Sequence, residues 1–196
     1  SRQRKTKVVL GAMFALAVRH DALYINPVQQ TSKIHRDRQE VRSLTIEDLQ
    51  RVRTALKKWA TEARPGPKAS SDMADIVDVM LGSGARIGEV LALRWADVDL
   101  AATPPTLTIK GTIRTEKGKG TYRKAHPKTE ASVRTTALPA FVAAVLRRRL
   151  AEASASEIDA VFPTRNDTWL QVSNVQRRWR EIRSDAGLDW VTPHTF

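Results

Sequence analysis

The spacing of hydrophobic residues predicts one helix near the start of the chain. Within residues 8–22 apolar side chains recur every three or four positions, which places them on one helical face. That face consists of Leu10, Phe14 and Ala17 or Val18. Asn26-Pro27 ends the pattern, because proline cannot continue a helix and restricts the residue before it.

From residue 43 the helical spacing returns and predicts several more helices. Thr45 followed by Asp48 is typical of a capped helix start, and the buried stripe of that helix is Leu49, Val52, Leu56 and Trp59. The next helix begins at Ser71, is interrupted at 82–84 and is followed by a short helix that runs to Leu93. Its inward residues are Met73, Ile76, Val77, Met80 and Leu81.

The middle of the chain changes to the alternating pattern of strands. Residues 106–114 alternate and are β-branched, 116–120 form a turn, and 122–138 are extended again. Helices then begin at Pro139 and Ser173, and Gly187 ends the second. Their inward residues are Phe141, Val142, Val145, Leu146 and Leu150 in the first, and Val175, Trp179 and Ile182 in the second. The sequence therefore predicts an α+β fold that is mostly helical, with a small antiparallel β-sheet inserted among the helices.

The pattern also divides the chain. Residues 29–43 are polar and basic with little periodicity, which indicates a linker between two bodies. Residues 1–28 are too few to fold alone, so we expect the C-terminal end of an upstream helical domain. Residues 44–196 form the second domain. Thr192-Pro193 is a helix start less than one turn before Phe196, so we expect this domain to be incomplete at its C-terminus.

Charge adds a partner to this picture. The 33 Lys and Arg against 21 Asp and Glu give a net charge of +12, which favours a polyanion such as nucleic acid over a merely basic surface. The sequence has no cysteine, which excludes disulfides and thiolate metal sites. It also lacks a signal peptide and a long apolar run, so we expect a cytoplasmic protein without a membrane partner.

The run 82–97 carries the first candidate site. Glycines flank Arg86, whose planar guanidinium can bind a phosphate where the backbone turns closely. Glu89 lies three residues on, so it shares a helix face with Arg86 and could hold that side chain in place. By spacing alone, a helix–turn–helix corner with a surface ion pair explains the same residues.

A basic hairpin is the second candidate site. Residues 110–134 hold eight basic and two acidic side chains, which suits an edge that contacts DNA. The predicted DNA-binding residues are Lys110, Arg114, Lys117, Lys119, Arg123, Lys124 and Arg134. For most single lysines, a solvated charge that protects a sheet edge is the alternative.

His194 forms the third candidate site. In Thr192-Pro-His-Thr195 this histidine would lie at a helix N-terminus, where it could donate a hydrogen bond or move a proton. A surface histidine without a role is the alternative. No other histidine has a metal-ligand spacing to it, so a zinc site has little support.

In order and spacing, these runs resemble the tyrosine recombinases of the phage integrase family. The likeness rests on Ala-Arg-Ile-Gly-Glu at 85–89, Lys-Thr-x-x-Ser-x-Arg at 128–134 and Thr-Pro-His-Thr-Phe at 192–196. Asn26-Pro27 followed by Leu44-Thr-x-x-Asp48 resembles the junction between that family's DNA-gripping and catalytic domains.

The resemblance implies an active site of two arginines, a lysine, histidines and a tyrosine nucleophile. Arg86 matches the first arginine, Glu89 the acidic residue that orients it, Lys128 the lysine and His194 the histidine. The second arginine would follow Phe196, and the nucleophilic tyrosine lies further on in the family. Tyr24 and Tyr122 stand in the wrong order to replace it, so we expect this fragment to be inactive.

The implied chemistry leaves a 3′-phosphotyrosine and needs neither a cofactor nor a catalytic metal. The implied partners are double-stranded DNA and further copies of the chain in a tetramer on DNA, with no small-molecule substrate. The expected function is site-specific DNA recombination or integration in a phage, prophage or bacterial setting. A helical DNA-binding regulator without chemistry and an inactive relative of the family are the alternatives.

Overall fold

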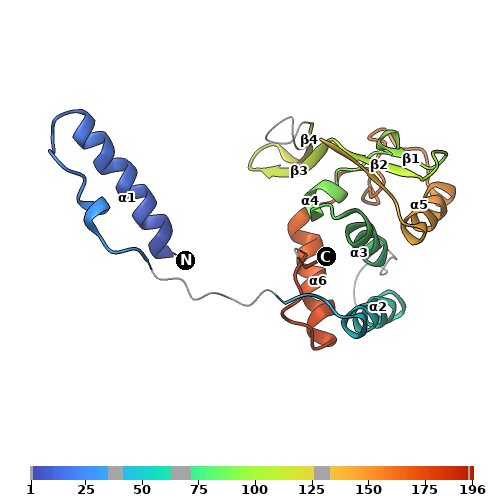
Figure 1. The fold of residues 1–196 in the computed structure, drawn as a ribbon. Helices are drawn as coiled ribbons and strands as arrows, with labels where there is room; N and C mark the ends of the chain where they lie inside the picture. The colour runs from blue at the N-terminus through green and yellow to red at the C-terminus, as the bar shows by residue number, and fades with distance from the viewer. Residues whose placement is uncertain (1, 35–41, 63–71, 126–132, 194) are drawn as a thin grey trace. The chain divides into compact units, whose positions relative to one another are not determined.

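The computed structural model describes residues 2–34, 42–62, 72–125, 133–193 and 195–196. The chain divides into two compact units, Ser1–Arg42 and Ser43–Phe196 (Figure 1).

In its described residues, the first unit holds one long helix and a short 3₁₀ helix. Helix α1 spans Arg2–Arg19 and the 3₁₀ helix η1 spans Pro27–Gln30. Asn26 ties them together, because its side chain accepts a hydrogen bond from the Val28 N–H (3.0 Å) and donates one to the Gly11 carbonyl (2.9 Å). Helix α1 buries none of its residues fully, and several of its apolar side chains, such as Val8, Met13 and Leu16, are exposed.

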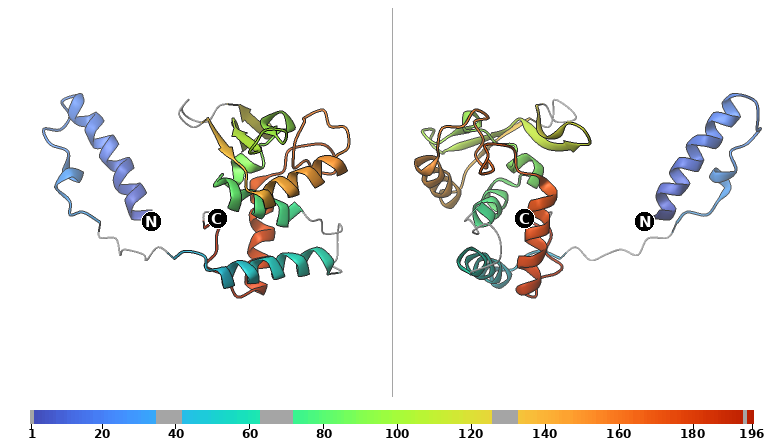
Figure 2. Two further views of the ribbon diagram at one scale, coloured as in Figure 1. Left: turned by 45° about the vertical axis from the view of Figure 1, so that its right-hand side comes forward. Right: turned by 180° about the vertical axis from the view of Figure 1, so that it is seen from behind.

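The second unit holds the remaining helices and all the strands of the described residues. In chain order they are α2 (Ile46–Thr61), α3 (Asp72–Ser83), α4 (Ile87–Val90), the 3₁₀ helix η2 (Trp95–Asp97), β1 (Val98–Asp99), β2 (Thr106–Ile109), β3 (Gly111–Glu116), β4 (Gly120–Ala125), β5 (Arg134–Ala137), α5 (Ala140–Glu152) and α6 (Val172–Asp185). The strands lie at one end of the unit and α2 at the other, with α3 between them (Figure 2). The predicted mostly helical α+β fold is confirmed.

The strands form two antiparallel sheets where the sequence predicted one. A three-stranded sheet has the order β1-β2-β5, and β3 and β4 form a separate hairpin. Strand β1 was not predicted, because two residues are too short to show alternation. In the first sheet Ile109 pairs with Arg134, and in the hairpin Ile113 pairs with Arg123. These two registers decide which arginines face the protein.

The structure confirms the predicted helix boundaries only in part. Thr45 and Asp48 form the predicted capping box of α2, and Gly187 follows the end of α6 with φ at +64°. The prediction that Ser173 caps α6 was wrong, since the helix begins at Val172 with Gln171 at its N-cap.

Two residues predicted to face inward on α5 are exposed. Phe141 is 41% exposed and Leu150 is 49% exposed, whereas Val142 and Leu146 are buried. Helix α5 approaches α3 closely at Gly82, where a Cβ would lie 2.2 Å from a Val142 methyl carbon. The tip of the Phe141 ring also lies beside Gly82, so Phe141 contacts α3 although much of its side chain stays exposed.

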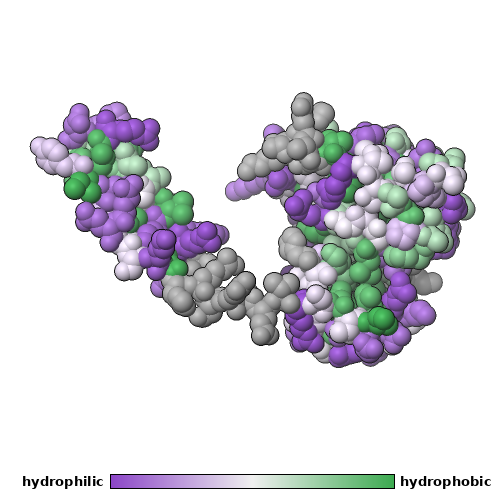
Figure 3. Space-filling model, in the orientation of Figure 1, coloured by the Kyte–Doolittle hydropathy of each residue, from purple (hydrophilic) through white to green (hydrophobic). Residues whose placement is uncertain are grey.

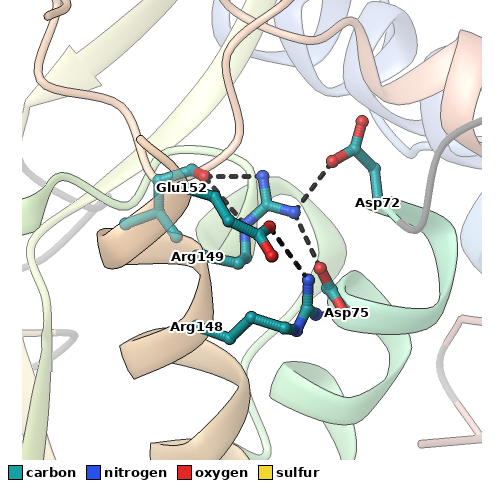
Figure 4. Close-up of polar contacts among 6 residues, drawn as sticks. Asp72, Asp75, Arg148, Arg149 and Glu152 are labelled. Carbon is teal, nitrogen blue, oxygen red and sulfur yellow. Dashed lines mark hydrogen bonds and ion pairs between the residues drawn. The ribbon is translucent and has the colours of Figure 1, made fainter. Parts of the chain in front are cut away.

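An ion-pair cluster joins α3 to α5. Arg149 donates to Asp72 and Asp75, both at 2.8 Å, and Arg148 also donates to the buried Asp75 (Figure 4). Arg149 further donates to the Val161 carbonyl. A buried carboxylate needs such partners, because burial without them is costly. The cluster therefore has a structural explanation.

Candidate active site and DNA interface

The turn between α3 and α4 exposes Arg86. Helix α3 ends at Ser83, and Gly84 takes a left-handed conformation with φ at +62°, which favours glycine. The Ser83 hydroxyl accepts a hydrogen bond from the Ala85 N–H and so stabilises the turn. Arg86 follows at the N-cap of α4 with a side chain that is 70% exposed.

Glu89 holds both the backbone and the side chain of Arg86. The Arg86 N–H donates to Glu89 Oε2 (2.9 Å), and Arg86 Nη1 donates to Oε1 (3.1 Å). The Glu89 side chain is only 8% exposed. A buried carboxylate thus anchors an exposed guanidinium.

Arg134 is the second arginine on this carboxylate. Its Nη2 donates to Glu89 Oε2 at 2.8 Å, from strand β5. Burial alone would raise the pKa of Glu89, but hydrogen bonds from Arg134 and from the backbone and side chain of Arg86 hold that pKa below its ordinary value. The carboxylate is therefore ionised at neutral pH.

Gly88 lets α4 pack against its neighbours. A Cβ at this position would lie 2.9 Å from the Thr112 hydroxyl of β3 and 3.9 Å from a Val172 methyl carbon of α6. The hairpin and the first turn of α6 therefore adjoin the helix that carries Glu89. Without a side chain at Gly88, both elements come close to the Arg86 turn.

The β3–β4 hairpin, together with Lys110 just before it, presents most of the predicted basic residues to solvent. The exposed members are Lys110, Arg114, Lys117, Lys119 and Lys124. Lys119 lies 3.5 Å from Glu116, and Lys110 lies 3.3 Å from Asp97 with half its side chain exposed. Hydrophilic residues dominate the end of the β3–β4 hairpin (Figure 3).

Arg123 differs from the rest of the hairpin. Its side chain is 9% exposed, its Nε donates to the Ala92 carbonyl (2.8 Å), and its Nη2 donates to the buried Asp97 (3.1 Å). The register puts it opposite Ile113, on the face of the hairpin that packs on the protein. A guanidinium with these partners has little surface for a phosphate, so Arg123 is removed from the DNA-binding set.

Two predicted site residues, Lys128 and His194, lie outside the described residues. The residues on both sides of His194 are held by α6. Trp179 Nε1 (3.0 Å) and Arg183 Nη1 (2.9 Å) both donate to the Val191 carbonyl, and the Phe196 ring meets Trp179 edge-on at 5.2 Å. The predicted helix start is a single turn in which the Thr195 N–H donates to the Thr192 carbonyl.

Neither tyrosine of the sequence lies in surroundings that would activate it. Tyr24 is fully exposed in the first unit. Tyr122 donates to Glu116 on the hairpin, and this hydrogen bond raises the pKa of its phenol. A raised pKa disfavours the phenolate that would attack a phosphate.

The described residues contain no group of three acidic or histidine side chains that could hold a metal ion. No helix in that part of the chain combines the length and apolarity needed to cross a membrane. A groove of about 400 Å³ does lie between α2 and α6, lined in part by Trp59 and Ile182, but Arg86 is not among its residues.

The order of Arg86, the basic hairpin and the 192–196 turn agrees with a known family. The sequence model of the phage integrase family matches residues 42–196. The chain belongs to the phage integrase family. A curated relative, a tyrosine recombinase XerC-like protein of Caldanaerobacter subterraneus subsp. tengcongensis, is 23% identical in an alignment of 174 residues that covers 80% of this chain and 41% of the relative.

Solved integrases and recombinases share the fold. The Tn1549 transposon integrase in complex with a circular intermediate DNA has a TM-score of 0.74 at 19% identity, over 98% of this chain and 62% of that one. The lambda integrase tetramer bound to a Holliday junction has a TM-score of 0.61 at 17% identity, over 96% and 49%. This phage integrase family chain thus spans less than two thirds of the relatives that it matches.

Sequence reasoning missed one basic surface of this family member. Helix α6 buries Val175, Trp179 and Ile182 and leaves Arg177 and Arg180 exposed on its other side. Its first residue lies beside Gly88, which places the start of this helix near the Arg86 turn. The signal was present as a cluster of arginines on the polar face of an amphipathic helix.

Proposed function

We propose that this chain is part of a site-specific DNA recombinase that cuts and rejoins double-stranded DNA through a 3′-phosphotyrosine. The observation that carries the proposal is the exposed Arg86 guanidinium, which a buried and ionised Glu89 holds in place. An ion pair that only decorates the surface does not need a buried carboxylate with two hydrogen bonds to its partner. An arginine that must meet a phosphate in a fixed orientation does need such an anchor.

The proposed chemistry assigns a role to each residue type. Arg86 binds the non-bridging oxygens of the attacked phosphate and neutralises the charge that develops there. Lys128 protonates the departing 5′ oxygen, and His194 donates a hydrogen bond to the phosphate. Neither Tyr24 nor Tyr122 is assigned as the nucleophile, so residues 1–196 by themselves are expected to cleave no DNA.

The proposed DNA interface combines the hairpin with α6. Lys110, Arg114, Lys117, Lys119 and Lys124 contact backbone phosphates, joined by Arg177 and Arg180. The net charge of +12 supplies the non-specific attraction. The Tn1549 integrase and the lambda integrase were solved on DNA, the latter as a tetramer, which supports DNA as the substrate and a tetramer as the assembly.

Residues 1–28 are proposed as the end of an upstream helical DNA-binding domain, whose remainder would cover the apolar side chains of α1.

The proposal is tested with the whole recombinase and a nicked DNA that traps the cleaved state. A covalent adduct should form at the 3′ phosphate, and mass spectrometry should map it to a tyrosine other than Tyr24 and Tyr122. The absence of any adduct, or an adduct at the 5′ phosphate, would exclude this recombinase chemistry. An adduct on Tyr24 or Tyr122 would overturn the assignment of roles.

A further inference from the structure

The position of Arg134 separates it from the other basic residues of its region. Strand β5 fixes its backbone, since Arg134 pairs with Ile109, a residue that is 1% exposed. From there Nη2 reaches Glu89 Oε2 at 2.8 Å across 45 positions of sequence. Its side chain is 36% exposed, about half the value for Arg86.

The same carboxylate oxygen serves both arginines. Glu89 Oε2 accepts from the Arg86 N–H and from Arg134, while Oε1 accepts from Arg86 Nη1. Without Arg134, the two remaining hydrogen bonds among these three would both come from Arg86, whose side chain is mostly in solvent. Glu89 and Arg86 could then turn together, because the hydrogen bond from the three-stranded sheet would be gone.

We propose that Arg134 is a positioning residue that holds the Glu89 carboxylate, and through it the guanidinium of Arg86, in the orientation that the DNA phosphate requires. This inference rests on the proposed function for the reaction, and on geometry alone for the contact. It replaces the expectation that Arg134 binds DNA. The lowered pKa of Glu89 supports it, because the hydrogen bond from Arg134 is the first of the contacts that oppose the effect of burial.

The first test uses NMR on this chain and needs no catalysis. The Arg86 Nε–Hε signal reports how firmly its guanidinium is held, and the Glu89 side-chain carbon reports the pKa of the carboxyl. Arg134→Gln should speed solvent exchange at Arg86 several-fold and raise the midpoint of the Glu89 titration. Arg165→Gln, which removes an exposed loop arginine, is the matched control and should change neither.

Two further variants keep this test decisive. Glu89→Gln should loosen Arg86 as much as Arg134→Gln does, and Arg134→Lys should give an intermediate result because only one N–H of Arg134 contacts Glu89. If Arg134→Gln does not fold, Arg134→Lys takes its place. The proposal would be overturned if the folded Arg134 variant, Gln or Lys, kept the wild-type exchange rate at Arg86 and the wild-type titration midpoint of Glu89.

The second test measures single-turnover cleavage and DNA affinity in the whole recombinase. Arg134→Gln should slow cleavage by about 10- to 100-fold, because small misplacements of a catalytic group cost that much, while Kd changes by less than about twofold. Adding Arg134→Gln to Glu89→Gln should cause no further loss, since both act through one contact. A weaker Kd, a salt slope reduced by about 0.9 and an unchanged Arg86 signal would instead make Arg134 a phosphate contact. If the wild type cleaves no DNA, the proposed function fails, and the NMR test still decides the role of Arg134.

Discussion

At the scale of single residues, the site depends on two hydrogen bonds that the exposed Arg86 donates to the buried carboxylate of Glu89. The spacing of Arg86 and Glu89 was visible in the sequence, because residues three apart share a helix face. The burial of Glu89 and its contact with Arg134 were not, since they depend on β5 pairing with β2. Long-range pairing of this kind leaves no local pattern to read.

Arg86→Lys in the whole recombinase should abolish most cleavage and leave DNA affinity almost unchanged. Lysine keeps the charge but lacks the planar group that binds two phosphate oxygens, and the loss of one such donor costs about 100- to 1000-fold in rate. Single-turnover cleavage and a binding isotherm at one salt concentration measure the two effects. An unchanged cleavage rate would make Arg86 a packing residue of the helix corner.

Lys128 should act as the proton donor, in contrast to its neighbours Lys117 and Lys119. A general acid matters only while the departing oxygen is a poor leaving group, and a bridging sulfur leaves without a proton. Lys128→Ala should therefore be slow on ordinary DNA and close to wild type on DNA with a 5′ bridging sulfur. Lys119→Ala should weaken binding to both substrates alike. If Lys128→Ala is equally slow on the sulfur substrate, the proton donor is elsewhere, and His194 is the next candidate.

At the scale of elements, the hairpin shows what alternation can and cannot predict. The β-branched run and the glycine-rich turn predicted β3 and β4. Charge alone then assigned seven of the eight basic residues of the region to DNA, although the pairing of β4 with β3 puts Arg123 on the same face as the buried Ile113. The partner that lets an arginine face inward, Asp97, lies 26 positions away. That distance in sequence is why the inward arginine was not predicted.

Arg123→Ala should destabilise the second unit and detach the base of the hairpin. Removing one partner of a buried ion pair leaves an uncompensated charge on Asp97, which costs about 3 kcal/mol. Lys110 remains near Asp97 at 3.3 Å and limits the loss. Urea denaturation measures the free energy of unfolding, with Arg114→Ala, an exposed arginine on the same hairpin, expected within about 0.5 kcal/mol of wild type. Equal stability of the two variants would show that the Arg123 contact does not hold the hairpin.

At the scale of the whole molecule, the helices and the kind of partner were best predicted from sequence, by apolar periodicity and by net charge. Stripes of apolar residues located the helices, because one-sided burial gives them a period near 3.6. They failed at Phe141 and Leu150, which lie on the apolar stripe of α5 and are nevertheless exposed. The net charge of +12 indicated a polyanion without saying which surface meets it. The proposed interface limits that surface to the hairpin and α6, which adjoin the helix that carries Glu89.

DNA binding by this chain should fall steeply with salt, and the hairpin should account for part of the fall. Each phosphate contact contributes about −0.9 to the slope of log K against log salt, so the wild type should show a slope of several units and Lys117→Gln/Lys119→Gln a slope about 1.8 units shallower. Lys57→Gln/Lys58→Gln removes the same charge from α2, outside the proposed interface, and should leave the slope almost unchanged. Fluorescence anisotropy with a short duplex from 50 to 300 mM salt, roughly the range in which counterion release dominates, gives all three slopes. Equal losses in the two double variants would mean that the overall charge attracts DNA and that the hairpin does not contact it. A flat plot for the wild type would exclude phosphate binding altogether.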